Sequence, residues 1–223
     1  MRVCAIVPAF NEADVIAGLV AAASRHVAEV VVVDDGSTDE TGARAAGAGA
    51  VCLTLARNSG KGTALRHGLG YIRERDFTHV LFMDGDGQHC PDDIPRLVEV
   101  ARDGADIVIG TRSFVKEAMP ASRHFSNTVG SRAASWLVGQ AILDSQSGFR
   151  LVRFDALRNV RLRARRYEFE MEVLIKLCAR GATVAHAAVT TVYDRGQARS
   201  KMNPVRDTIR ICLWSLVFRF GPG

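Results

Sequence analysis

Residues 3–40, VCAIVPAFNEADVIAGLVAAASRHVAEVVVVDDGSTDE, hold two short apolar runs with one helical pattern between them. Residues 3–7 and 30–33 are apolar throughout, which is typical of strands that are buried on both faces of a sheet. From about residue 12 to residue 25, apolar residues recur at the spacing of a helix. A strand, a helix and a second strand of these lengths predict two parallel strands joined by a crossover helix.

The same alternation continues along the chain. We expect further strands at residues 51–55, 79–83, 105–110 and 148–152, and helices at residues 38–48, 61–75 and 91–103. This order predicts an α/β fold, in which helices cover both faces of a mostly parallel sheet. A chain of 223 residues fits one such domain. We expect the domain to span residues 1–203 and a C-terminal amphipathic helix to span residues 204–223.

Charged residues are unevenly distributed along the chain. Residues 1–143 carry 14 basic and 17 acidic side chains, whereas residues 144–223 carry 15 basic and 7 acidic ones. An acidic first part suits a metal site, and a basic second part suits phosphate, a membrane surface or nucleic acid. Solvated arginines on helix faces would produce the same bias. The five cysteines form no CxxC pair, which predicts a reducing compartment and no zinc site.

Polar and charged residues follow each of the first five predicted strands. In an open parallel sheet, ligands bind beyond the carboxyl ends of the strands, which lie at one edge. We therefore expect the functional site at that edge, built from residues 8–12 (PAFNE), 34–37 (DDGS), 57–61 (RNSGK), 84–88 (DGDGQ) and 110–112 (GTR).

Asp84 and Asp86 flank a single glycine directly after an apolar strand. Alternate side chains of an extended segment point the same way, so two carboxylates placed like this repel each other unless a cation joins them. Mg²⁺ and Mn²⁺ prefer oxygen ligands and stabilise the charge on a departing diphosphate. A lone pair of this kind is often structural, but its place at a strand end strengthens the metal interpretation. We predict that Asp84, Asp86 and Gln88 hold Mg²⁺ or Mn²⁺.

Two further segments have both a structural and a binding interpretation. Ser37 or Thr38 could cap the helix that follows, but capping does not explain the consecutive acids Asp34 and Asp35, which suit hydrogen bonds to a base or a ribose. Lys61 ends a glycine-containing loop and could hold phosphate, or could simply begin a helix.

The ordered set of these segments resembles the family 2 inverting glycosyltransferases with the GT-A fold. Within that family it is most similar to the dolichyl-phosphate mannosyltransferase and polyprenyl-phosphate glycosyltransferase group. Later motifs support the resemblance, which covers about residues 3–203: GTR at 110–112, DSQSGFR at 144–150, YEFEME at 167–172, and Arg195 with Ser200 and Lys201.

The resemblance, together with the motifs above, implies a donor pocket, a metal site and an acceptor site. For the nucleotide sugar it indicates Pro8, Asn11, Glu12, Asp34, Asp35, Lys61 and Asp84; for the metal, Asp84, Asp86 and Gln88. For the acceptor it indicates Ser147, Arg150, Glu168, Glu170, Arg195, Ser200 and Lys201; for catalysis, Asp86, Arg112 and Asp144.

The implied reaction is an inverting transfer of sugar from GDP-mannose or a UDP-sugar to a polyprenyl or dolichyl phosphate. A lipid phosphate is already an anion, so positioning by Arg112, Arg195 and Lys201 would suffice. A hydroxyl acceptor on a glycan, a lipid or a small molecule would need a general base, for which Asp144 is the candidate. Asp144 could equally cap the turn before the strand at residues 148–152.

The tail from residue 204 to residue 220 carries an apolar stripe at helical spacing, with Arg206, Asp207 and Arg210 on the other face. Such a helix could lie in a membrane interface beside a basic surface and bring the protein to a lipid acceptor. It could instead dock on its own core or on a second subunit. With no secretory signal and no run of about 20 apolar residues, we expect a cytoplasmic protein, peripheral at the cytoplasmic face of a membrane if the first interpretation holds.

Other classes of protein explain fewer of these features. A nucleotidyltransferase would place a glycine-rich loop with Arg and Lys after the first strand, where residues 8–12 read PAFNE. A non-catalytic module that binds nucleic acid or membrane would use the arginine-rich residues 158–166 but would leave the acids at the strand ends unexplained. We therefore expect no nucleic-acid partner. The sugar, the base and the oligomeric state do not follow from the sequence.

Overall fold

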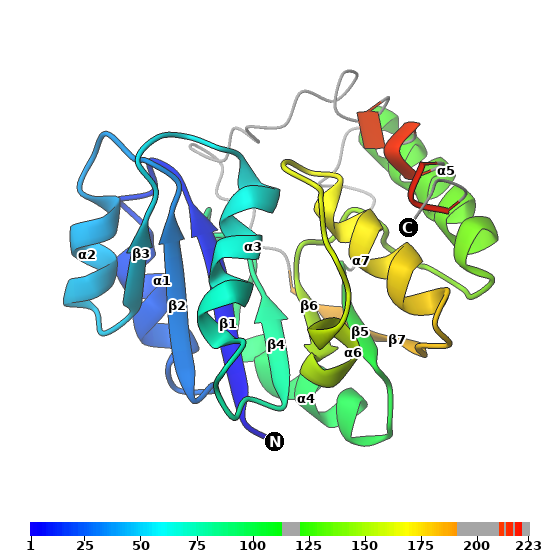
Figure 1. Ribbon diagram of the computed structural model, residues 1–223, viewed down its shortest axis with the longest axis horizontal. Coiled ribbons are helices and arrows are strands. Elements are labelled where there is room, and N and C mark those ends of the chain that lie inside the picture. Colours follow the sequence, from blue (N-terminus) through cyan, green and yellow to red (C-terminus); the bar gives the residue numbers. More distant parts are fainter. Residues whose placement is uncertain (113–120, 191–209, 212, 216, 220–223) are drawn as a thin grey trace.

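The computed structural model describes residues 1–112, 121–190, 210–211, 213–215 and 217–219, and it contains one seven-stranded sheet between helices (Figure 1). The strand order across the sheet is β3-β2-β1-β4-β6-β5-β7. The strands are β1 (Val3–Ala9), β2 (Glu29–Asp34), β3 (Val51–Thr54), β4 (His79–Phe82), β5 (Ile107–Arg112), β6 (Arg150–Arg153) and β7 (Val184–Val189). The predicted α/β fold is confirmed.

The sheet is parallel except at β6. β1 pairs in parallel with β2 and β4, β2 pairs with β3, and β5 pairs with β7. β6 lies between β4 and β5 and runs antiparallel to both, with Arg150 opposite Phe82 on one side and Ile109 on the other. The first residue of β6 therefore lies where β4 ends, and the loop before β6 reaches the same edge as the loops after the parallel strands.

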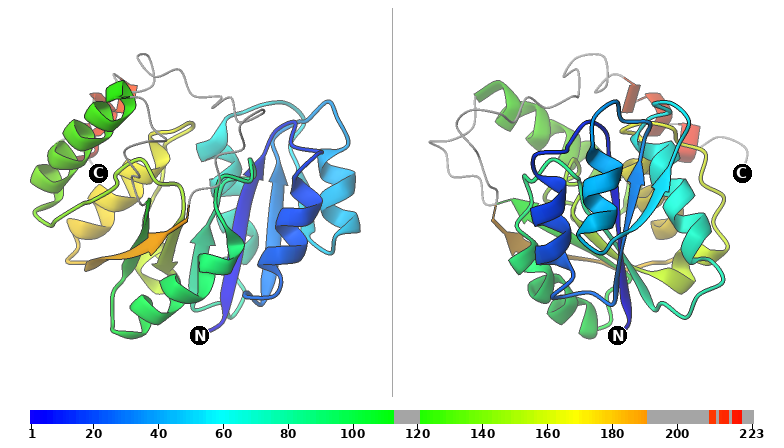
Figure 2. Two further views of the ribbon diagram at one scale, coloured as in Figure 1. Left: turned by 180° about the vertical axis from the view of Figure 1, so that it is seen from behind. Right: turned by 90° about the vertical axis from the view of Figure 1, so that its left-hand side faces the viewer.

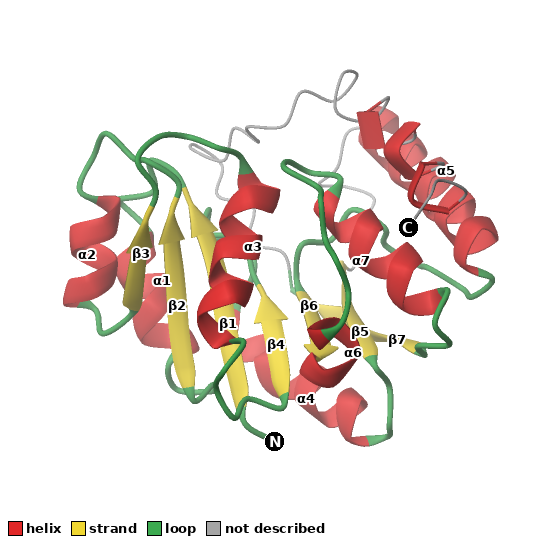
Figure 3. Ribbon diagram, viewed as in Figure 1, coloured by secondary structure: helices red, strands yellow, loops and turns green. Residues whose placement is uncertain are grey.

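Helices cover both faces of the sheet (Figures 2 and 3). They are α1 (Ile16–Ala23), α2 (Thr41–Gly47), α3 (Lys61–Ile72), α4 (Ile94–Arg102) after the 3₁₀ turn η1 (Pro91–Asp93), α5 (Ala121–Val138), α6 (Phe154–Arg158) and α7 (Phe169–Cys178). α1 and α2 begin later than the sequence predicts, at residue 16 instead of 12 and at residue 41 instead of 38. The reason is that the residues before them bond to each other across the two loops, as described below.

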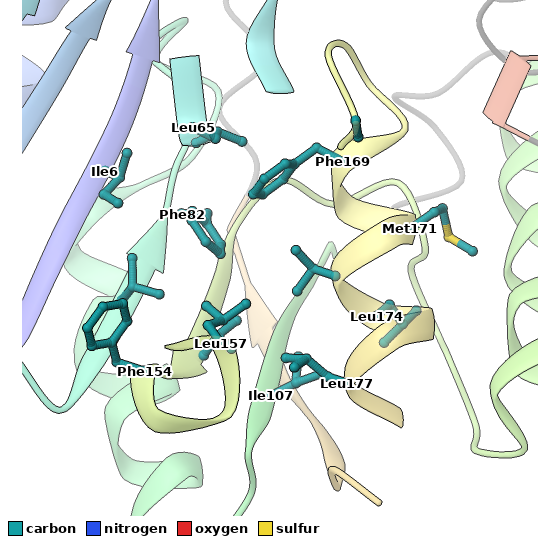
Figure 4. Close-up of a cluster of buried hydrophobic side chains, with 14 of the residues drawn as sticks. Ile6, Leu65, Phe82, Ile107, Phe154, Leu157, Phe169, Met171, Leu174 and Leu177 are labelled. Carbon is teal, nitrogen blue, oxygen red and sulfur yellow. The ribbon is translucent and has the colours of Figure 1, made fainter. Parts of the chain in front are cut away.

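The core consists of two apolar layers, one on each face of the sheet. Alternate residues of β1 divide between them, because successive side chains of a strand point to opposite faces. Cys4 and Ile6 belong to the first layer, with residues of α3, α5, α6 and α7, whereas Ala5 and Val7 belong to the second, with residues of α1 and α4. Figure 4 shows the first layer, where Phe82 and Phe169 meet edge to face with ring centroids 5.4 Å apart.

A short C-terminal helix, of which the structure describes residues 210–211, 213–215 and 217–219, lies beside α5 (Figures 1 and 2). Ile211 and Phe218 pack against the first apolar layer, and the Nε of Arg219 donates to the carbonyl of Leu137 in α5 at 3.1 Å. Leu213, Trp214 and Val217 are instead 60%, 39% and 53% exposed. Part of this helix thus docks on its own core, while an apolar face of it remains open. Among the described residues, no helix is long and apolar enough to cross a membrane.

α3 offers a direct test of how tightly the first layer is packed, because two of its three glycines lie in contrasting surroundings. A Cβ on Gly68 would lie 2.5 Å from Cγ2 of Ile6, whereas a Cβ on Gly70 would meet nothing within 4 Å. We expect Gly68→Ala to lower the free energy of unfolding by about 1–3 kcal/mol through overpacking. Gly70→Ala should leave it unchanged or raise it by up to about 1 kcal/mol. Urea denaturation of both variants measures this, and equal stabilities would contradict the packing.

Candidate active site

The loops after β1 and β2 are joined by hydrogen bonds between side chains and backbone. Asn11, whose φ of 53° is in the left-handed region, accepts at Oδ1 from the amide of Thr38 at 2.8 Å. The amide of Glu12 in turn donates to Oγ1 of Thr41 at 2.8 Å. Asn11 tolerates the left-handed region better than most residues, and this turn brings the two loops together. The structure therefore places the predicted donor residues Asn11 and Glu12 beside the β2 loop and the start of α2, whereas Pro8 lies within β1, opposite Val33 of β2.

The two consecutive acids after β2 bond to backbone amides. The carboxylate of Asp35 is buried and accepts from the amides of Ser59 at 2.7 Å and Gly60 at 2.8 Å, so both of its oxygens hold the loop that leads into α3. Oδ1 of Asp34 accepts from the amide of Ser37 at 2.9 Å. In this structure, Asp35 thus holds the loop before α3 in place. The nucleotide contacts expected of these two acids stay a prediction.

Asp84, at the end of β4, is part of a buried ion triplet. The ammonium of Lys61 lies 2.6 Å from Oδ1 of Asp84 and 2.5 Å from Oε1 of Glu170. Burial alone would raise the pKa of Asp84, but the charge of Lys61 and the neighbouring His89 hold that pKa well below its usual range. Lys61 therefore bonds to carboxylates in this structure, although the sequence suggested phosphate as its partner. Glu170, predicted near the acceptor, faces the metal motif.

Asp86 and Gln88 complete the predicted metal motif. Oδ1 of Asp86 accepts from the amide of Gln88 at 3.0 Å. Burial and the nearby charge of Asp84 raise the pKa of Asp86. Across the described residues, no three His, Cys, Asp or Glu side chains cluster tightly enough to hold a metal by themselves. Two carboxylates and an amide fit Mg²⁺ or Mn²⁺, because such an ion commonly binds through one or two carboxylates and the phosphates of its substrate.

Arg112, the last residue of β5, forms a two-pronged ion pair with Asp144. Its Nε donates to Oδ2 at 2.7 Å and its NH2 group donates to Oδ1 at 2.9 Å. Asp144 is completely buried, and burial alone would raise its pKa, but the hydrogen bonds and charge of Arg112 hold the pKa below its usual range. A carboxylate with both oxygens engaged and a lowered pKa is a poor proton acceptor, so the arrangement disfavours Asp144 as a general base.

Arg150 and Ser147 lie in the interior, and the acceptor contact expected of them stays a prediction. The guanidinium of Arg150 donates to the carbonyls of Ser145 at 2.7 Å, Ser147 at 2.8 Å and Glu170 at 2.8 Å. Ser147 is also buried, and its Oγ accepts from the amide of Phe149 at 3.3 Å. These two residues shape the loop before β6 and join it to α7.

Glu168, also predicted near the acceptor, links α7 to the C-terminal helix. Its Oε1 accepts from the NH2 group of Arg210 at 2.9 Å and from the amide of Arg165 at 3.2 Å. Glu168 is buried, whereas the side chain of Arg210 is 33% exposed, so the ion pair is half-buried. The remaining predicted acceptor residues, Arg195, Ser200 and Lys201, lie outside the described residues.

The structure adds two residues to the site that the sequence did not single out. His89 is buried, stacks on Phe149 with ring centroids 5.0 Å apart, and places Nε2 3.8 Å from Oδ2 of Asp84. A Cβ on Gly148 would lie 2.5 Å from Oδ2 of Asp84 and 2.9 Å from Nζ of Lys61. His89 directly follows the metal motif in sequence, which could have indicated it. The closeness of Gly148 depends on the fold and leaves no local pattern.

Comparison with known proteins agrees with this geometry. A family model described as "Glycosyl transferase family 2" matches residues 4–161. The chain is 31% identical over 236 residues to the undecaprenyl-phosphate mannosyltransferase of Micrococcus luteus, covering 99% of this chain and 96% of that protein. It is 27% identical to the polyprenol monophosphomannose synthase of Mycolicibacterium smegmatis, covering 96% and 87%.

Solved structures show the same fold. The glucosyl-3-phosphoglycerate synthase of M. tuberculosis matches with a TM-score of 0.76 and 22% identity, covering 100% of this chain and 82% of that one. A crystal structure of that synthase in complex with Mn²⁺ and UDP-glucose matches with a TM-score of 0.75. These likenesses confirm the predicted GT-A fold.

The hydrogen bonds to the carboxylate of Asp35 yield a prediction about the loop before α3. We expect Asp35→Asn to lower the free energy of unfolding by about 1–3 kcal/mol, because one of two amides bound by a charged, buried carboxylate loses its acceptor. Hydrogen exchange at the amides of Ser59 and Gly60 should accelerate. Asp103→Asn, at an exposed position, is the matched control. Unchanged exchange at both amides would show that the loop is held by other contacts.

Proposed function

Because this chain belongs to glycosyl transferase family 2, we propose that it moves a sugar from a GDP-mannose or UDP-sugar type of donor to a polyprenyl or dolichyl phosphate. The names of two relatives that align with nearly the whole chain refer to undecaprenyl phosphate and to polyprenol. The proposed acceptor is thus a long lipid that ends in a phosphate.

The ion pair between Arg112 and Asp144 is the structural observation that best supports a phosphate acceptor. A hydroxyl acceptor needs a group that takes its proton, and the candidate base Asp144 has both oxygens bound to Arg112 at 2.7 and 2.9 Å. A lipid phosphate is already ionised and needs only to be held in line with the donor. The paired state of Asp144 is compatible with this second chemistry and disfavours the first.

The proposed reaction is one displacement with inversion at the anomeric carbon. An oxygen of the lipid phosphate forms the new bond to that carbon while the bond to the nucleoside diphosphate breaks and its electron pair leaves with the diphosphate. Asp84, Asp86 and Gln88 would hold Mg²⁺ or Mn²⁺, whose charge stabilises the departing diphosphate. The loops after β1 and β2 would hold the nucleoside, and Arg195 and Lys201 would hold phosphates of the donor and the acceptor.

The open face of the C-terminal helix suits contact with a membrane. Leu213, Trp214 and Val217 are exposed there, and Trp is favoured at the boundary between lipid and water. Arginines of the segment 161–166, next in the chain to α7, are exposed and would attract anionic headgroups. We propose that the protein binds peripherally to the cytoplasmic face of a membrane through this helix, where its acceptor is found.

The transfer proposal is tested by incubating the protein with GDP-mannose and UDP-sugars, Mn²⁺ or Mg²⁺, and polyprenyl phosphate, and by measuring sugar in the organic phase. We expect lipid-dependent transfer, and we expect Asp86→Ala to reduce turnover by at least about 100-fold, since charge on the leaving group loses its stabilisation. Asp103→Ala, at an exposed site, should match the wild type.

Near-normal turnover of Asp86→Ala would remove Asp86 from the metal site. Release of nucleoside diphosphate without a lipid product would move the acceptor to a hydroxyl compound.

Membrane contact is tested with the double variant Leu213→Glu/Trp214→Glu and vesicles that contain anionic lipid. We expect roughly tenfold weaker binding or more, because two apolar side chains no longer enter the interface. The double variant Ala43→Glu/Ala46→Glu is the control: it adds the same charge to exposed positions of α2, at the other end of the molecule (Figure 1). If the Leu213→Glu/Trp214→Glu variant bound vesicles as well as the wild type, and sedimentation of the wild type showed a concentration-dependent dimer, this face would be a contact with a second copy of the chain.

A further inference from the structure

One ammonium group joins three separate elements at the predicted metal motif. Lys61 begins α3, Asp84 follows β4, and Glu170 lies in the first turn of α7. The Nζ of Lys61 lies 2.6 Å from Oδ1 of Asp84 and 2.5 Å from Oε1 of Glu170. All three side chains are largely buried, with exposed fractions of 16%, 27% and 9%. The cation is therefore held between two acids in a place with little solvent.

The backbone around Lys61 fixes where its ammonium can lie. A Cβ on Gly62 would lie 2.8 Å from the carbonyl of Ala164, so α3 begins in close contact with the segment before α7. On the other side, Gly148 lies so near that a Cβ there would be 2.9 Å from Nζ of Lys61. Because the backbone lies this close, the side chain of Lys61 has little freedom. The fold itself therefore holds the ammonium of Lys61 against Asp84.

The ammonium of Lys61 opposes an incoming metal ion, although the carboxylates around it attract one. Asp84, Asp86 and Glu170 supply three carboxylates, and Lys61 supplies the ammonium bound to two of them. A divalent ion that approached Asp84 would meet the positive charge of Lys61 within a few ångströms. In a partly buried site such repulsion weakens binding by tenfold or more, on the order of what a unit charge exerts at an effective dielectric constant of about 20. A diphosphate that arrived with the ion would offset it with its own negative charge.

We propose that Lys61 is a positioning residue that keeps the metal affinity of the free protein low, so that the divalent ion binds firmly only together with the donor diphosphate. This role presupposes the sugar-transfer function proposed above. It differs from the direct phosphate contact that the sequence suggested for Lys61, since the partners of its ammonium are carboxylates. Glu170 contributes by holding the ammonium from the side opposite Asp84.

The test measures Mn²⁺ binding without any nucleotide, by the electron paramagnetic resonance signal of unbound Mn²⁺. We expect Lys61→Met to bind Mn²⁺ at least about tenfold more tightly than the wild type, because the competing charge is gone. Lys61→Arg, which keeps the charge, should stay near the wild type. Lys176→Met is the matched control: Lys176 in α7 forms a similar pair with Glu172 at 2.6 Å, away from the metal motif.

Glu170→Gln provides a second measurement that does not depend on the folding of Lys61→Met. Glu170→Gln removes one carboxylate and leaves the ammonium of Lys61 bonded to Asp84. We therefore expect this variant to bind Mn²⁺ at least a few times more weakly than the wild type. Equal or weaker Mn²⁺ binding by Lys61→Met, or unchanged binding by Glu170→Gln, would overturn the proposal. Mn²⁺ binding is measured without turnover. If the protein did not transfer sugar to lipid phosphate, the proposed function would be refuted, but the effect of Lys61 on Mn²⁺ binding could still be measured.

Discussion

The reversal of β6 between β4 and β5 determines which residues meet at the active edge. A parallel strand in that place would have left the loop before it at the opposite edge of the sheet. Because β6 is antiparallel, Arg150 lies opposite Phe82 at the end of β4 and opposite Ile109 within β5, and the preceding loop comes close to Asp84. The buried guanidinium of Arg150 then joins this loop to α7 through backbone carbonyls, which supply the partners that a buried charge requires.

Ion pairing divides the acids of this edge into two kinds. Asp84, Asp144 and Glu168 each bond to a lysine or an arginine, so these carboxylates stay ionised and fixed. Within the described ranges, Asp86 forms no such pair, and its pKa is raised by burial and by Asp84. With three acids paired in this way and Asp86 beside Asp84, the edge attracts a cation to a defined place. The same pairing makes Asp84, Asp144 and Glu168 poorly suited to remove a proton.

Periodicity was enough to predict the strands and helices of the first half of the chain, because each buries a regular set of apolar positions. The place of the functional edge followed from the rule for parallel sheets, and the resemblance of the ordered motifs to one family predicted the fold that the solved structures share. The partners of individual side chains could not be predicted in this way. Asp35 bonds to amides 24 and 25 residues away, and Arg150 to a carbonyl 20 residues away, and such contacts leave no periodic pattern.

Hydrogen bonds across loops also account for the displaced helix boundaries. α1 begins late because Asn11 bonds to the amide of Thr38 in the β2 loop and the amide of Glu12 bonds to Thr41 at the start of α2, so a turn precedes the helix. The antiparallel direction of β6 likewise depends on which strands it joins, and a short apolar run carries no information about direction.

The two apolar layers share their strands, and this has a consequence for how the molecule comes apart. Alternate residues of β1 belong to different layers. If the helices left one face of the sheet, the strands would lose their packing on that face, and the same strands form the layer on the other face. The sheet and its helices should therefore unfold as one cooperative unit. Among its described residues, the C-terminal helix adds Ile211 and Phe218 to one layer alone. It can therefore detach at a lower free-energy cost than the rest, which makes it the natural first site of local opening and of cleavage by a protease.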